Sequence, residues 1–275
     1  VEDGVITDLG AGAPPAGDES VAAAGRMVPP GLIDAHTHAC WAGDRRDEWR
    51  QRLAGASYLD LLKHGGGIMS TVRSVRAASK DELCASLVDR LDLMLRHGTT
   101  TSEGKSGYGL DTASELKMLA AIEAAGRASP MHIVPTACIG HAKDLECADP
   151  VRTTIDETLP AVHETHPHVA IDAYCEQGAW SVGECVALFE AAQVLGHPVR
   201  VHTDQFNMQG MVDEAIGLGA CSVDHLEASD QATLERIGEA SGDGLIAVRQ
   251  PASGFHLDER YADGRTLIDS GARVV

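Results

Sequence analysis

From about residue 28 to the end, short apolar segments rich in β-branched residues alternate with longer segments whose apolar positions have helical spacing. The apolar segments predict strands over 28–38, 98–105, 131–139, 168–176, 198–205, 220–226, 245–250 and 272–275. The segments between them predict helices over 79–97, 111–126, 149–165, 181–195, 209–217, 229–240 and 263–270. Strands that alternate with helices pair in parallel, so the pattern predicts an α/β fold.

Eight strand–helix units in this length suit a (β/α)8 TIM-like barrel, although the count alone also allows a doubly wound open sheet. Polar residues decide between the two. His36, His38, Glu103, His202 and His225 all fall late in predicted strands. In a barrel, the ends of all strands meet at the carboxyl face where active sites assemble, whereas an open sheet gathers only residues near its switch point. We therefore predict the barrel.

The first 27 residues differ from the rest of the chain. They hold Gly, Ala, Pro and acidic residues around the short apolar stretch 4–9. We interpret 1–27 as the remnant of a small β domain with a linker, and 28–275 as the barrel, incomplete at its eighth strand. Because the chain begins at Val1 and has no initiator Met, we expect it to be a piece of a longer protein.

Composition narrows the function. The chain of 275 residues has 22 Lys and Arg against 41 Asp and Glu, a formal charge of −19. Such an acidic surface repels nucleic acid and anionic membranes, so we expect neither as a partner. No run of 18 apolar residues exists. Seven cysteines, an odd number without a Cys-x-x-Cys pair, indicate reduced thiols in the cytoplasm.

The most informative stretch is 30–38, PGLIDAHTH, in which a buried-strand pattern ends in two histidines. Residues two apart on a strand point the same way, so His36 and His38 should project together. Two neutral imidazoles held side by side suit Zn²⁺ or iron. A bare His-x-His is more often a pair of unrelated surface histidines, but the preceding strand favours a metal site.

Two more histidines end later strands: His202 closes 199–202 and His225 closes 222–225. Either one alone would be an ordinary packed histidine. Four imidazoles at one end of one barrel instead predict a metal centre with a position left for water. Since a bound metal acidifies that water, the pattern indicates a hydrolase.

Three further residues are candidates for holding a substrate. Tyr108 lies between two glycines in a loop that follows the second predicted strand, and the plain alternative is an ordinary turn. Arg45 follows His38 by seven residues, and its planar guanidinium suits a substrate carboxylate. His141 follows the third strand on the active side, where a structural and a functional role are equally open.

These residues resemble a known family. The stretch PGLIDAHTH resembles the metal-binding opening of the amidohydrolase superfamily. More specific stretches resemble imidazolonepropionases within that superfamily: GGGIMSTVRSVRAAS (65–79), KSGYGLD (105–111), IGHA (139–142), VHTDQ (201–205) and SVDHLE (222–227). The resemblance covers about residues 28–275 and implies metal-dependent opening of a cyclic amide in histidine breakdown.

The resemblance implies a role for each candidate. His36, His38 and His202 would bind one Zn or Fe ion per chain, and His225 would lie beside the attacking water. The choice between Zn and Fe stays open. The reaction implied is hydrolysis of 4-imidazolone-5-propanoate to N-formimidoyl-L-glutamate.

The implied substrate is a small anionic heterocycle. Arg45, Tyr108 and His141 would hold it, with Arg45 facing the carboxylate, and Gln205 would contact the ring. The resemblance is compatible with a homodimer, while the sequence leaves the oligomeric state open.

One feature of the family is missing from this chain. The family has an Asp at the end of the eighth strand that serves as metal ligand and general base, and here the chain ends at Val275, where that strand begins. We therefore expect this chain to be impaired. Two alternatives stay open: a related deaminase or hydrolase of another cyclic substrate, and an inactive barrel fragment that binds a partner.

Overall fold

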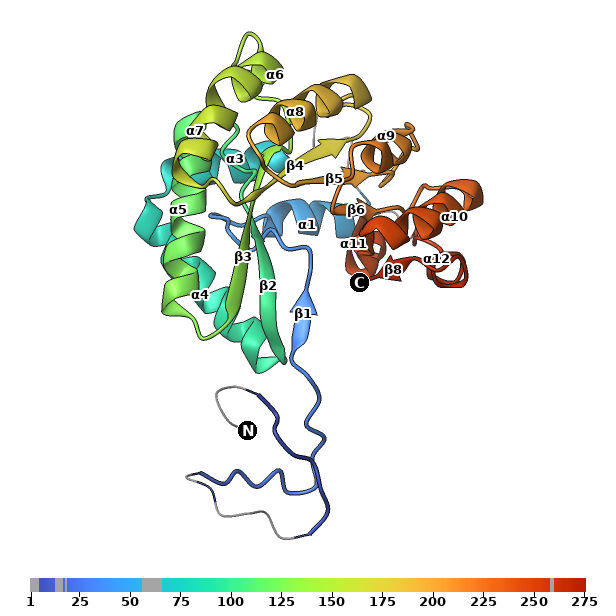
Figure 1. Cartoon of the computed structure of the whole chain (residues 1–275). Coiled ribbons are helices and arrows are strands. Elements are labelled where there is room, and N and C mark those ends of the chain that lie inside the picture. Colours follow the sequence, from blue (N-terminus) through green and yellow to red (C-terminus); the bar gives the residue numbers. More distant parts are fainter. Residues whose placement is uncertain (1–4, 13–16, 18, 56–65, 258–259) are drawn as a thin grey trace. The chain divides into compact units, whose positions relative to one another are not determined.

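The computed structural model describes residues 5–12, 17, 19–55, 66–257 and 260–275 (Figure 1). Contacts between residues divide the chain into two units, Val1–Pro30 and Gly31–Val275. In the first unit, the backbone N–H of Arg26 donates to the carbonyl of Ala23 and closes a turn. The interpretation of 1–27 as a domain remnant stays a prediction.

Eight strands form one parallel sheet, and the sheet follows chain order from β1 to β8 (Figure 1). The strands are β1 Leu32–Asp34, β2 Thr99–Lys105, β3 His132–Gly140, β4 Ala170–Cys175, β5 Val199–Thr203, β6 Ser222–His225, β7 Ile246–Val248 and β8 Arg273–Val274. Each strand pairs with the next one in the chain; Tyr174 in β4, for example, pairs with His202 in β5. The predicted α/β fold with eight parallel strands of the (β/α)8 type is confirmed.

Helices connect the strands. They are α1 Arg46–Leu53, α3 Ile68–Ala77, α4 Lys80–Arg96, α5 Thr112–Ala128, α6 Pro150–Thr153, α7 Leu159–Thr165, α8 Val182–Val194, α9 Met211–Gly217, α10 Gln231–Ala240, α11 Pro251–Leu257 and α12 Gly264–Asp269. A π-helical turn over Thr154–Thr158 joins α6 to α7, and a 3₁₀ turn over Ser241–Asp243 follows α10. No helix in the described part of the chain is long and apolar enough to cross a membrane.

Helix α4 shows how local sequence sets an element. Ser79 accepts a hydrogen bond from the N–H of Glu82, whose side chain bonds back to the N–H of Ser79, and this capping box starts the helix. Leu83, Leu87 and Leu91 follow at intervals of four, so all three lie on one face and are buried. That face packs against α5 and forms one of two apolar cores. The other core joins strands β3 to β7 to helices α7, α8, α9, α10 and α12, with Leu119 of α5.

The structure differs from the sequence expectation in three helices and in the first strand. Three helices, α1, α3 and α11, were not predicted; α1 buries no residue, so it has no apolar periodicity to detect. The first strand was predicted over 28–38 but spans only Leu32–Asp34. Pro29 and Pro30 have no N–H for a sheet ladder, and the chain leaves the sheet after Asp34. His36 and His38 therefore lie in the loop that follows β1.

Candidate metal and active site

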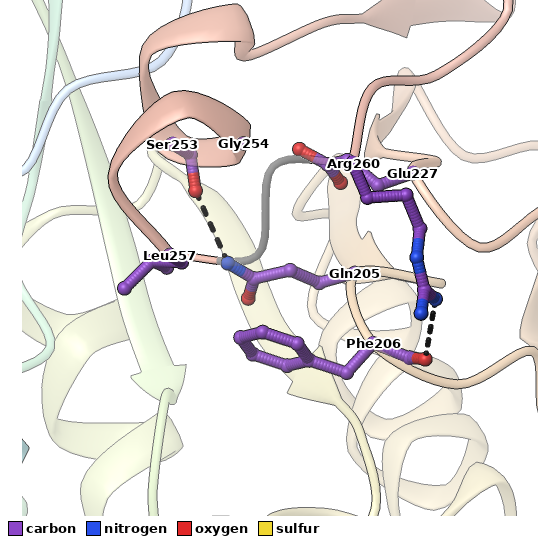
Figure 2. Close-up of a pocket in the computed structure, with 7 residues that line it drawn as sticks. All are labelled: Gln205, Phe206, Glu227, Ser253, Gly254, Leu257 and Arg260. Carbon is purple, nitrogen blue, oxygen red and sulfur yellow. Dashed lines mark hydrogen bonds between the residues drawn. The ribbon is translucent and has the colours of Figure 1, made fainter. Parts of the chain in front are cut away.

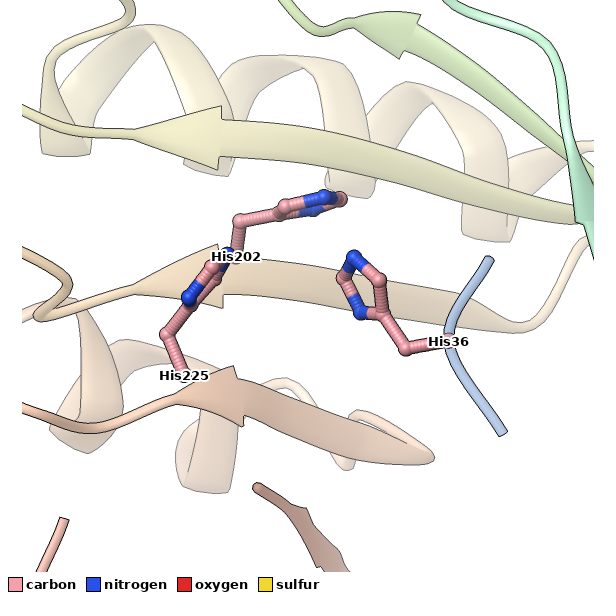
Figure 3. Close-up of side chains that lie close together, drawn as sticks. All are labelled: His36, His202 and His225. Carbon is pink, nitrogen blue, oxygen red and sulfur yellow. The ribbon is translucent and has the colours of Figure 1, made fainter. Parts of the chain in front are cut away.

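Four histidines from three separate segments meet at the carboxyl ends of the strands. The rings of His36 and His202 lie 4.4 Å apart between centroids, and that of His225 is 5.6 Å from the first and 5.5 Å from the second (Figure 3). The ring of His38 lies 5.2 Å from both His36 and His202. The structure thus brings together the four imidazoles that the sequence analysis selected.

Ring nitrogens, and not only rings, converge. In each of two groups, His36–His202–His225 and His38–His141–His202, one nitrogen per residue lies within 4.8 Å of the others. The Nε2 atoms of His38 and His202 are 3.0 Å apart. His202 belongs to both groups, whereas His36 and His38 fall in different ones, so the three predicted ligands do not form a single group.

Burial keeps these imidazoles neutral. It lowers the pKa of His36 and of His38 well below the ordinary value, and the positive charge of Lys105 lowers both further. Burial also lowers the pKa of His202 to about 4, although the nearby carboxylate of Asp172 opposes the shift. The pKa of His141 falls to about 4 for the same first reason, against a hydrogen bond with the carbonyl of Gly107. Neutral imidazole is the form that binds a metal.

The donor set fits a metal ion of the zinc or iron type. Nδ1 of His202 lies 3.0 Å from a carboxylate oxygen of Asp172, which can only accept, so Nε2 of His202 carries the lone pair. Nδ1 of His38 is buried without a hydrogen-bond partner. If Nε2 of His38 carries the proton, the lone pair on Nδ1 has no partner. If Nδ1 carries it, that N–H has no acceptor and the Nε2 lone pairs of His38 and His202 face each other. A cation that accepts these lone pairs removes that cost.

His225 is held by an unusual backbone. His225 and Leu226 both have positive φ, 85° and 71°, a conformation that side chains with a Cβ seldom adopt. The N–H of Leu226 donates to the carbonyl of Thr203, and that of Ala228 to the carbonyl of Asp204, which ties this turn to the end of β5. Nδ1 of His225 lies 3.4 Å from Oε1 of Glu227. The turn keeps the imidazole of His225 at the cluster.

Tyr108 and His141 line the other side of the cluster. The ring of His141 stacks on His38 at 4.5 Å with an interplanar angle of 17°. Tyr108 lies 5.2 Å from His141 and 5.6 Å from His38. Nδ1 of His141 lies 2.9 Å from the carbonyl oxygen of Gly107, so this histidine also anchors the loop that carries Tyr108.

Gln205 joins the cluster through Tyr174, which the sequence analysis did not select. The hydroxyl of Tyr174 donates to Oε1 of Gln205 at 2.7 Å, and the Tyr174 ring lies 5.8 Å from His202. The amide nitrogen of Gln205 donates to Ser253 (Figure 2). Gln205 and Glu227 also line a small hollow beside the end of α11 (Figure 2).

Arg45 is the exception among the selected residues. Its guanidinium forms an ion pair with Glu48 at 2.7 Å. The same carboxylate accepts the N–H of Gly67. Within the described residues, no hydrogen bond or ion pair joins Arg45 to the histidines. Its predicted role in holding a carboxylate remains a prediction.

A buried layer of charge next to the histidines escaped the sequence analysis. It contains three carboxylates and two cations from β2, β4, β5 and β6: Glu103, Lys105, Asp172, Arg200 and Asp224. Glu103, noted for its late position in a strand, pairs with Lys105 and Arg200 here, not with a histidine. A polar residue at every second position of these strands was the available signal, because such residues share one face.

Comparison with known proteins agrees with this geometry. The amidohydrolase family model matches residues 27–262. An imidazolonepropionase of Herpetosiphon aurantiacus is 43% identical over 92% of this chain and 61% of its own length. One of Haloarcula marismortui is 40% identical over 98% and 64%, and one of Deinococcus deserti is 40% identical over 100% and 68%. The chain therefore spans a little under two thirds of the first two relatives.

Solved structures share the fold at low sequence identity. A 5-methylcytosine deaminase from Klebsiella pneumoniae with bound 5-fluorocytosine has a TM-score of 0.66 at 14% identity, over 93% of this chain and 66% of that one. An atrazine chlorohydrolase from Arthrobacter aurescens complexed with zinc has a TM-score of 0.57 at 17% identity, over 89% and 58%. At such identities the likeness concerns the fold alone.

Proposed function

This chain belongs to the amidohydrolase family, and we propose that the protein opens the ring of 4-imidazolone-5-propanoate to give N-formimidoyl-L-glutamate. The imidazolonepropionases that match it at 40–43% identity support this substrate. The rings of His36, His38 and His202 lie 4.4–5.2 Å from one another between centroids. This cluster supports the chemical part of the proposal, because hydrolysis of an amide at neutral pH benefits from a metal.

One metal ion per chain, Zn²⁺ or iron, is the proposed cofactor. His36, His38 and His202 would hold it, since burial lowers the pKa of all three and so keeps them neutral. Nε2 of His202 lies 3.0 Å from Nε2 of His38, and a ring nitrogen of His202 lies within 4.8 Å of one of His36. When bound, such an ion supplies Lewis acidity to a carbonyl oxygen and lowers the pKa of water.

His225 is the proposed proton carrier. Its Nδ1 faces the carboxylate of Glu227, so Nδ1 holds a proton and Nε2 is free to accept one. As the oxygen of water bonds to the ring carbonyl carbon, Nε2 of His225 takes one proton from that water. When the carbon–nitrogen bond breaks, His225 returns the proton to the leaving nitrogen, and atoms and charge balance.

Four residues are proposed to hold the substrate. The Tyr108 hydroxyl and the His141 ring flank His38, so they would contact the heterocycle. Gln205, fixed by Tyr174, would contact the ring from the side of His202. Arg45 would pair with the propanoate carboxylate. For that, its guanidinium must either contact this carboxylate and Glu48 together or give up its ion pair with Glu48.

Turnover of the imidazolone by the protein expressed from its complete gene and loaded with zinc tests the proposal. We expect loss of the substrate's ultraviolet absorbance and formation of N-formimidoylglutamate, identified by mass. His38→Ala should lose both zinc and turnover. His163→Ala is the matched control, because His163 pairs with His197 outside the cluster. A wild type with full zinc and no turnover would reject the substrate, and turnover of a purine or pyrimidine instead would favour a deaminase.

The cytoplasm is the proposed location. All seven cysteines are free, and four of them, Cys40, Cys138, Cys175 and Cys185, are buried, which suits a reducing cytoplasm. A homodimer is the proposed assembly. Light scattering that gives the mass of one chain would reject it.

A further inference from the structure

We propose that Asp172 and Asp224 are positioning residues that fix the ring tautomers of His202 and His36, and that the buried Lys105 holds both carboxylates in place. The inference rests on the proposed metal site and deepens it. It names the residues that set the ring tautomer of two proposed ligands, His36 and His202.

Asp172 determines which nitrogen of His202 can bind a metal. Oδ1 of Asp172, in β4, lies 3.0 Å from Nδ1 of His202, in the neighbouring strand β5. Both side chains are buried, so water does not compete for this contact. An ionised carboxylate only accepts hydrogen bonds; Nδ1 of His202 must therefore carry the proton, and Nε2 presents its lone pair to His38.

Asp224 does the same for His36 across a separation of 188 residues. Its Oδ2 lies 2.6 Å from Nδ1 of His36, and the two side chains are 0% and 4% exposed. The proton again belongs on Nδ1, so Nε2 of His36 is left to bind. Carboxylates that accept from ligating histidines in this way orient the ring and raise its basicity.

Lys105 connects the two carboxylates. It is fully buried, and its ammonium forms a short contact with Oδ2 of Asp172, the oxygen that His202 does not use. The same ammonium lies 3.8 Å from Oδ2 of Asp224. Arg200 reaches Asp224 at 3.2 Å, and the Ser222 hydroxyl donates to the remaining oxygen of Asp224. Neither carboxylate can rotate without losing several of these contacts.

The charge of this layer also favours a cation above it. Three carboxylates against two cations leave one formal negative charge, counting Glu103, Asp172, Asp224, Lys105 and Arg200. This charge is buried, where screening by water is weak. A positive ion at the histidines would balance it.

The plain alternative is a salt-bridge layer that only packs the interior of the sheet. Glu103 distinguishes the two hypotheses. It pairs with the same Lys105 and Arg200, at 3.1 and 2.5 Å, but within the described residues it forms no hydrogen bond or ion pair with a histidine. If the layer is merely structural, removing the charge of Glu103 should harm the site as much as removing that of Asp172. If the carboxylates set tautomers, the two changes should differ.

The first test is nitrogen-15 NMR of the histidine rings in metal-free wild-type protein, with His36 and His202 assigned from H36N and H202N. We expect protonated Nδ1 and unprotonated Nε2 in both rings. Protonated Nε2 in either ring would overturn the inference. This measurement needs no metal and no folded Asp variant, so it decides the inference even if the protein binds no zinc and the proposed function fails.

The second test compares the zinc dissociation constants of Asp172→Asn, Asp224→Asn and the control Glu103→Gln, measured by competition with a chelator. An amide can donate as well as accept, so it no longer excludes the other tautomer. We expect the two Asn variants to bind zinc about 10–100-fold more weakly, in the range known for such outer partners. Glu103→Gln should weaken zinc binding much less than either Asn variant, because it removes the same charge but no contact with a histidine. Equal weakening in all three would overturn the inference, whatever their activity.

Discussion

The carboxylate of Glu115 holds the loop of Tyr108. It accepts the backbone N–H groups of Gly107 at 2.9 Å and Gly109 at 2.7 Å, the two residues that flank Tyr108. It also accepts the N–H of Leu110. Glu115 itself is 1% exposed, at the start of α5, so this loop is anchored from inside the protein.

Glu115→Gln should therefore loosen Tyr108. One buried N–H then faces an amide NH2 and loses its acceptor, which costs about 1–3 kcal/mol of unfolding free energy. We expect KM for the substrate to rise more than kcat falls, because the proposed role of the loop is to hold substrate and not to carry the proton. Urea unfolding and steady-state kinetics measure both effects. Tyr108→Phe, which keeps the loop, should change KM without the loss of stability; equal stability losses would contradict this account.

His225 and Glu227 should act as a pair in turnover and not in metal binding. Removing a general acid–base group typically costs about 10²–10⁴-fold in rate, so we expect a loss of this size in kcat for His225→Gln. Glu227→Gln should give a smaller loss, since Nδ1 of His225 lies 3.4 Å from the Glu227 carboxylate and would keep a weaker partner. Both variants should retain zinc, measured by elemental analysis. Zinc lost from His225→Gln would instead make this residue a ligand.

The stability of the metal-free protein should fall as pH falls below about 6.5. Burial lowers the pKa of His141 and His202 to about 4 in the folded state, while both titrate near 6.5 when unfolded. Between these two pH values the unfolded chain binds more protons than the folded one. The free energy of unfolding therefore falls as the solution is acidified. Each histidine should cost about 2 kcal/mol at pH 5 relative to pH 8.

Urea unfolding at pH 8 and pH 5 checks this pH effect. His141→Asn should reduce the difference in unfolding free energy between the two pH values by the share of one histidine. A difference unchanged by that variant would show that other groups dominate.

Gly140 lets β3 approach β4 directly before His141. A Cβ on Gly140 would lie 2.5 Å from Cβ and 2.9 Å from Cα of Ala173. Gly140→Ala should therefore cost about 1–3 kcal/mol by overpacking and should displace His141. Gly183→Ala is the control, since nothing lies within 4 Å of a Cβ there and Gly183 is helical. That variant should gain about 0.5–1 kcal/mol by thermal unfolding; equal effects at both positions would contradict this account.

Much of the fold was predictable, because its elements follow local patterns. The helix predicted over 79–97 spans Lys80–Arg96, and the strand predicted over 198–205 spans Val199–Thr203. Apolar spacing and caps act over a few residues, so they are visible in the chain itself. Helix α1 was missed because it buries no side chain, and the strand predicted over 28–38 was too long because it included two prolines.

The candidate site divides in the same way. His36 follows a strand, and His202 and His225 lie at the ends of two others. Because parallel strands end at one face of the sheet, their meeting could be inferred. Tyr174 gave no such signal, and the alternation of polar residues could place Lys105 on one face of its strand without identifying its partners. Their importance depends on which charged and polar atoms from other strands lie beside them.

The sequence by itself determined the order of strands and helices, the rim on which the histidines lie and the family to which the chain belongs. Only the tertiary structure decided that Asp172 faces His202, that Asp224 faces His36 across 188 residues, and that Arg45 is paired with Glu48. The reason is physical: apolar periodicity reports burial along one element, whereas a buried charge finds its partner through the folding of distant segments, where the cost of leaving it unpaired is high.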